Sequence, residues 1–145
     1  MTEHTILRVV AKLTIPFILL FALYVQFHGE YGPGGGFQAG VIFAAGIILY
    51  TLIFGLDEAR RVIPPWAVRA LISGGVLIYA GTGVACMLLG GDFLDYNVLA
   101  HKPAHGQHLG IILVELGVGV TVTGGMIGIF FVFAGRGRRR EGTVE

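Results

Sequence analysis

An acidic side chain and three histidines are the residues whose types and positions suggest ion chemistry. Glu115 is the only charged residue in the apolar stretch from about Leu109 to Ala134, and it lies roughly 9 Å along a helix axis from the start of that stretch. A carboxylate at such a depth costs about 2.5–3.5 kcal/mol on membrane-insertion scales, so it usually has a partner or a task. One interpretation is a proton-relay group. The other is a carboxylic acid that bonds to a neighbouring helix and does not titrate.

The histidines His101, His105 and His108 have spacings of four and three, which would place all three on one face of a helix. Such a face could hold zinc or collect protons near Glu115. Pro103 interrupts the run, however, and polar residues are common in loops. We therefore keep the three histidines as candidates for an ion or proton path and expect no bound metal and no cofactor.

A proline and three glycines form the most unusual backbone signal, Pro33-Gly34-Gly35-Gly36-Phe37. Proline fixes φ and glycine frees it, so this run does not continue a helix comfortably. Its N–H groups before a helix could receive an anion or a carbonyl, as at a broken helix beside an ion path. The simpler alternative is a tight turn between two membrane spans, and the sequence leaves both open.

The elements that must position these residues are membrane-spanning helices. Of the 145 residues, 54% are hydrophobic and 13% are charged, and the mean hydropathy is +0.78; a soluble domain is about 45–50% apolar and about 25% charged. A bilayer is crossed by roughly 20 mostly apolar residues. Four stretches are long enough, at about 5–27, 37–56, 68–89 and 109–134. The sequence predicts an all-α integral membrane protein, a single domain over residues 1–145, with Cys86 as a buried, inert thiol.

The distribution of positive charge predicts the orientation. All of the ten Lys and Arg residues except Lys102 lie at the N-terminus, around the middle connection, or in the tail after Ala134. Because positive residues stay in the cytoplasm, both termini and the middle connection should face inward. The glycine motif and the histidines would share the outer face, and Trp66 would lie beside the inner headgroups. Basic residues that flank spans instead of forming a polar stripe argue against a nucleic-acid partner.

Small residues within the spans predict close helix packing. Gly36, Gly40 and Ala44 are four apart on one face of the second span. A second set lies in the fourth span: Gly117, Thr121, Gly124, Gly125 and Gly128. Such spacing lets helix backbones approach closely in lipid. We expect packing within this bundle to explain part of the pattern and contacts with other subunits to explain the rest.

Two stretches carry a resemblance to a known family: HGEYGPGGGFQAG at 28–40 and VELGVGVTV at 114–122. With the four-span layout, they make the chain similar to the MnhB family, whose members are small subunits of the Mrp-type multisubunit cation/proton antiporters. Many members have a different pair of residues in place of Tyr31-Gly32, and the basic tail from Arg136 is individual. Both departures could mark a subgroup with a different ion or partner.

The resemblance implies a role in a hetero-oligomer of the bacterial inner membrane that exchanges Na⁺ for H⁺. The chain would be a small accessory subunit, not an enzyme, that the assembled antiporter needs, and Pro33 and Phe37 would be sensitive to substitution. A contribution to the ion or proton path stays open. Two alternatives remain: an independent homo-oligomeric transporter that uses Glu115, and a membrane subunit of a redox complex resembling respiratory complex I.

Overall fold

Helices make up the regular structure of this chain. The computed structural model describes residues 3–29 and 32–141. Within these ranges the elements are α1 (Glu3–His28), α2 (Gly36–Phe54), α3 (Leu56–Val62), α4 (Pro65–Leu88), the short 3₁₀ helix η1 (Tyr96–Leu99) and α5 (Pro103–Glu141), with no strand. Four of them, α1, α2, α4 and α5, are long and apolar enough to cross a membrane. The predicted all-α membrane architecture with four spans is therefore confirmed.

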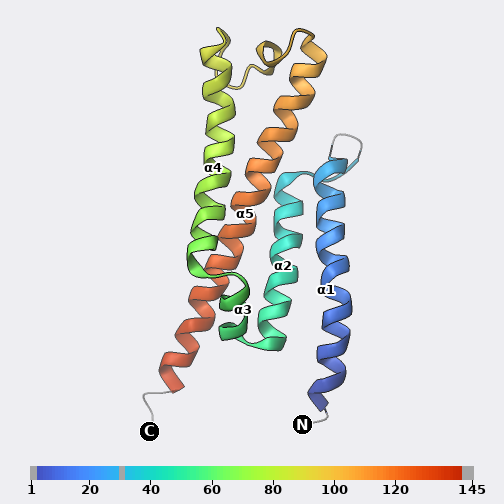
Figure 1. Cartoon of the computed structure of the whole chain (residues 1–145), viewed down its shortest axis with the longest axis vertical. Coiled ribbons are helices and arrows are strands. Elements are labelled where there is room, and N and C mark those ends of the chain that lie inside the picture. The colour runs from blue at the N-terminus through green and yellow to red at the C-terminus, as the bar shows by residue number, and fades with distance from the viewer. Residues whose placement is uncertain (1–2, 30–31, 142–145) are drawn as a thin grey trace.

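The long helices form a staggered row in the order α4, α5, α2, α1 (Figure 1). α5 packs against α4 on one side and against α2 on the other, while α1 packs mainly against α2. α1 begins and α5 ends at the same end of the bundle, as four crossings require (Figure 1). Which membrane face this end meets stays the prediction made from the positive charges.

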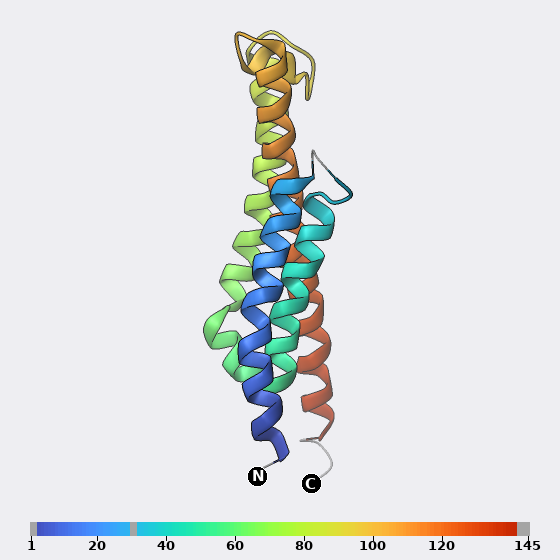
Figure 2. The ribbon, with the colours of Figure 1, turned by 90° about the vertical axis from the view of Figure 1, so that its right-hand side faces the viewer.

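The two halves of the row differ in height. The upper parts of α4 and α5 rise beyond the turn that joins α1 to α2, and both views show this step (Figures 1 and 2). The contacts agree with it: Gly36, the first residue of α2, packs on Glu115, whereas α4 lies beside Gly117 at Tyr79 and continues to Leu88. α5 itself extends about 18 Å above Glu115, at 1.5 Å per residue from Pro103.

The helix ends differ from the expected spans in ways that the local sequence explains. The connection after α2 holds a seven-residue helix, α3, with Asp57 and Glu58 in its first turn and Arg60 and Arg61 in its last turn. These charges complement the helix dipole at both ends. The helix of the fourth span, α5, begins at Pro103, six residues before the expected start of that span, because proline suits the first turn of a helix.

Glycines allow α5 to approach both of its neighbours closely. A Cβ at Gly40 of α2 would lie 2.6 Å from the carbonyl oxygen of Gly119. On the other side of α5, a Cβ at Gly75 of α4 would lie 2.6 Å from the carbonyl oxygen of Gly117. These contacts confirm that part of the small-residue pattern serves packing within the bundle. Gly125, in contrast, has no atom of another element within 4 Å of its Cβ position.

The lower half of the bundle holds the main apolar core. It is formed by Ala44, Ala59, Val68, Ile127 and Phe131, which come from α2, α3, α4 and α5. This core therefore ties α3 to the long helices.

At the opposite end of the bundle, Cys86 is fully buried and not disulfide-bonded, as the sequence predicted.

Candidate functional site

Glu115 lies on α5 where the α1–α2 pair reaches its upper end. It is twelve residues from the start of α5, about 18 Å along the axis. This distance exceeds the roughly 9 Å expected from the sequence, because α5 begins before the expected start of its span. The side chain is half-buried. Among the described residues of the four candidate spans, Glu115 is the only Asp or Glu. The site is therefore built around one carboxylate.

The wall that faces this carboxylate is the backbone of the α1–α2 connection. A Cβ at Gly29 would lie 3.0 and 3.1 Å from the two carboxylate oxygens of Glu115, and one at Gly35 would lie 3.3 Å from Oε1. Both glycines therefore have their main chains close to the carboxylate. The glycine motif and Glu115 are separate signals in the sequence, and the fold brings them together. Glu30 and Tyr31, within the same connection, lie outside the described residues.

Two of the motif glycines are required by the backbone itself. Gly36 packs directly on the main chain of Glu115, where a Cβ would overlap the carbonyl oxygen. Gly35 has φ +153°, a conformation that side-chain-bearing residues rarely adopt. The motif is thus a tight connection between two spans and also a surface fitted against the Glu115 segment. Whether it borders an ion path stays a prediction.

The remaining motif residues have different surroundings. Pro33 is exposed on the turn, and Gly34 leaves room for the side chain and carbonyl of Val25 on α1. Phe37, the second residue of α2, is 63% exposed. Such a large apolar ring in a span must face lipid or another chain. Gly40 continues the α2 face that meets α5.

The three candidate histidines lie above Glu115 at the upper end of the bundle. His105 and His108 belong to the first turns of α5, whereas His101 precedes the helix. The three therefore do not share one helix face. His108 is seven residues before Glu115, about two turns above it and on the same face of α5. All three side chains are exposed.

The connection between α4 and α5 is held on α5 by η1. The ring of Tyr96 packs directly on Gly110, in the space that a Cβ there would need. Burial raises the pKa of the Tyr96 phenol above its ordinary value of 10.0, with further contributions from Tyr79 and Cys86. Tyr96 is therefore neutral at physiological pH. Its role is to position the segment that leads into the histidines.

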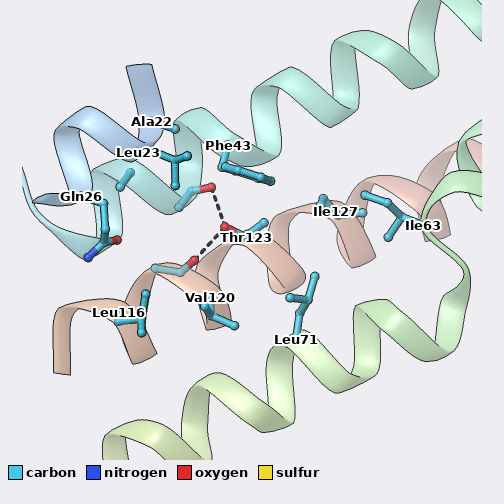
Figure 3. Close-up of a pocket in the computed structure, with 13 residues that line it drawn as sticks. Ala22, Leu23, Gln26, Phe43, Ile63, Leu71, Leu116, Val120, Thr123 and Ile127 are labelled. Atoms are coloured by element: carbon cyan, nitrogen blue, oxygen red, sulfur yellow. Dashed lines mark hydrogen bonds between the residues drawn. The ribbon is translucent and has the colours of Figure 1, made fainter. Parts of the chain in front are cut away.

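A cleft of about 180 Å³ lies between α1, α2, α4 and α5, and Leu116, the residue after Glu115, belongs to its lining (Figure 3). Two polar side chains border it, and neither was predicted as a site residue. The side-chain oxygen of Gln26 lies over Gly119, 2.5 Å from the position of a Cβ there. The hydroxyl of Thr123 is 2.8 Å from the Gly119 carbonyl oxygen and 3.2 Å from the Gly40 carbonyl oxygen, and it donates to them. A polar residue within an apolar span was the signal that could have identified both.

The rest of the lining is apolar. Ile63, Leu71 and Ile127 form the end of the cleft that lies away from Gln26 (Figure 3). Gln26 and Thr123 both lie against Gly119, which is about one turn below Glu115 on α5, and the cleft residues beyond Thr123 are apolar. The described lining therefore offers no continuous polar route for a proton or a hydrated cation. Within the described ranges, no three His, Cys, Asp or Glu side chains form a group that could hold a metal ion.

Comparisons with known proteins agree with this arrangement. Residues 6–128 match the family model described as "Domain related to MnhB subunit of Na+/H+ antiporter". Proteins named "Putative antiporter subunit mnhB2" from Staphylococcus aureus strains Newman, JH1 and USA300 are each 35% identical over 136 residues. That alignment covers 92% of this chain and 96% of each relative. The residues matched by the family model include the glycine connection and Glu115.

Proposed function

The chain belongs to the family related to the MnhB subunit of Na⁺/H⁺ antiporters, and on this premise we propose that it is a small accessory subunit of a hetero-oligomeric Na⁺/H⁺ antiporter. Its location would be the bacterial inner membrane, which it crosses four times. Its partners would be the other antiporter subunits, and the assembly would exchange Na⁺ for H⁺. Its task would be transport and assembly, without catalysis of a chemical reaction.

The observation that carries this proposal is that Glu115, the one carboxylate among the described residues of the spans, stands above an almost wholly apolar cleft. Of the residues that line this cleft, only Gln26 and Thr123 have polar side chains, and its far end is formed by Ile63, Leu71 and Ile127. Moving an ion over this apolar part would require polar groups from another chain, since an unsolvated charge in hydrocarbon is costly. An accessory subunit that supplies one segment of a shared path fits this geometry better than a transporter that works alone.

We propose that Glu115 contributes a proton-binding group to that shared path. Its carboxylate is held against Gly29 and Gly35, where backbone dipoles can orient it. Two turns above it on the same face, His108 lies exposed near the start of α5, the end that the charge distribution predicts to be external. Protons collected at that end would have a short route to the carboxylate.

Affinity purification in mild detergent tests the accessory role. The tagged chain, isolated from its native membrane, should be recovered together with large antiporter-like subunits identified by mass spectrometry. Reconstitution of the purified chain alone in liposomes should give no cation/proton exchange. A stable homo-oligomer that exchanges ions without partners would overturn the proposal.

The substitution Glu115→Gln tests the role of the carboxylate, because glutamine keeps its shape and hydrogen-bonding capacity but does not titrate. We expect normal recovery of the complex, reduced antiport in membrane vesicles and a changed pH profile of the remaining activity. Glu58→Gln is the matched control, since Glu58 is exposed on α3 and pairs with its neighbour Arg61 at 2.8 Å. Unchanged antiport across the pH profile would reduce Glu115 to a packing residue while leaving the accessory role intact.

A further inference from the structure

A second cleft lies at the other end of the bundle, far from Glu115 along α5. It has a volume of about 210 Å³ and is bounded by α3, α4 and α5. Its lining consists of Arg60, Pro65, Val68, Arg69, Gly128, Phe131 and Val132. This end of the bundle carries α3 and both chain ends (Figure 1). The cleft is therefore separate from the candidate ion-path site.

Two guanidinium groups border this cleft, and neither forms a salt bridge with another described residue. Arg60 of α3 and Arg69 of α4 are both exposed. Within the described part of the chain, the one salt bridge joins Arg61 to Glu58. Arg60 makes a long hydrogen bond, donating to the carbonyl oxygen of Phe131 at 3.5 Å. Among the described residues, the cleft thus presents two positive charges without a paired carboxylate.

Beneath these charges the lining is apolar. Val68 and Phe131 are each 5% exposed and lie at the bottom of the cleft, while Val132 is 56% exposed. Gly128, also in the lining, has no side chain and therefore leaves space in the cleft. Trp66, 65% exposed in the first turn of α4, has the amphipathic ring typical of the headgroup level of a membrane. The cleft therefore combines a charged rim at the headgroup level with a hydrocarbon-like interior.

We propose that this cleft is a binding site for an anionic phospholipid. The phosphate lies between Arg60 and Arg69, and one acyl chain lies along Val68, Phe131 and Val132. Guanidinium groups bind phosphate oxygens strongly through paired N–H donors. Basic pockets between transmembrane helices recognise anionic headgroups in this way. A lipid held there would tie α3 to α4 and α5.

The only tryptophan of the chain provides a direct test, because Trp66 stands next to Pro65 in the lining. The full-length chain in detergent micelles is titrated with phosphatidylglycerol or phosphatidylcholine whose acyl chains carry bromine, which quenches tryptophan fluorescence on contact. We expect phosphatidylglycerol to quench Trp66 at lower concentrations than phosphatidylcholine. Arg60→Gln and Arg69→Gln should each weaken that preference about ten-fold, as expected for loss of a charged group that hydrogen-bonds the phosphate.

Arg61→Gln is the matched control, since it removes the same charge from the same short helix but does not line the cleft. Its preference for phosphatidylglycerol should stay close to that of the unaltered chain. Equal quenching by both lipids would overturn the proposal, and so would an equal effect of Arg61→Gln, which would indicate a diffuse positive surface. If the assembled complex excludes the brominated lipid that the single chain binds, the cleft belongs to a partner protein and the lipid assignment is wrong.

Discussion

Substitution of Gly40 by alanine is the sharpest test of the packing between α2 and α5. The added Cβ would lie 2.6 Å from the carbonyl oxygen of Gly119 and 2.9 Å from Cβ of Val122. The nearest atom belongs to the backbone of α5 and cannot rotate away. The two helices must therefore separate by about 0.8 Å to reach ordinary contact at 3.4 Å.

A separation of this size has a predictable cost. A gap of about 0.5–1 Å forfeits a quarter to a half of the dispersion attraction between the atoms involved, and overpacking of a close interface typically costs about 1–3 kcal/mol. The hydrogen bond that Thr123 donates to the Gly40 carbonyl oxygen at 3.2 Å would also lengthen. We expect the thermal midpoint of the purified chain in detergent to fall by about 3–10 °C.

Gly125→Ala is the matched control, because Gly125 lies on α5 and no atom of another element is within 4 Å of its Cβ position. Fluorescence-detected size-exclusion after heating measures both variants under the same conditions. The Gly125 variant should melt at or above the midpoint of the unaltered chain, since alanine favours helix by up to about 1 kcal/mol. If Gly40→Ala leaves the midpoint unchanged, or if both variants lose the same amount, the close approach of α2 to α5 is not what stabilises this fold.

Two further substitutions address the connection that faces Glu115. Phe37→Ala should leave the thermal midpoint of the isolated chain nearly unchanged, because the ring is 63% exposed, but it should lower recovery of the assembled antiporter or its flux in a pull-down and vesicle assay. Survival of both assembly and flux would show that Phe37 faces lipid without consequence. Gly35→Ala should destabilise the chain by about 1–3 kcal/mol, because its φ of +153° is unfavourable for alanine. A thermal midpoint equal to that of the unaltered chain would refute that strain.

The four spans could be predicted because hydropathy is a local property. Gly36–Phe54 contains no charge at all, and its length and composition identify a span without reference to any other residue. The helix α3 was missed because Leu56–Val62 is too short for a hydropathy signal. Its acidic first turn and basic last turn were visible, and they are the pattern that could have identified it. The early start of α5 at Pro103 had a similar signal, since proline is common at the first position of a helix.

The arrangement of the candidate site could be predicted only in part. The sequence identified Glu115 as a carboxylate inside a span and Pro33–Phe37 as an irregular backbone stretch, but not that Glu115 and the motif glycines touch. That contact depends on how far α2 is shifted along α5, and the shift is set by Gly36 and Gly40 fitting against the α5 backbone. No local pattern encodes the register between two helices. Gly125 illustrates the same limit. It belongs to the same small-residue pattern in α5 as Gly117 and Gly124, which pack closely on α4, but no atom of another element lies within 4 Å of its own Cβ position.

The step in height between the two halves of the bundle has a consequence for the surrounding bilayer. α4 continues above the level of the α1–α2 connection, and its last turns remain apolar and exposed at Val84, Met87 and Leu88. A hydrocarbon layer thick enough to cover these residues would submerge the connection, whereas a layer fitted to the 19 residues of α2 would leave them in water. Such a mismatch is relieved when lipid thins locally or when another chain fills the step. Thinning beside α1 and α2 would bring the aqueous surface down toward Glu115 from the side, so that a proton could reach the carboxylate without a pore through this chain.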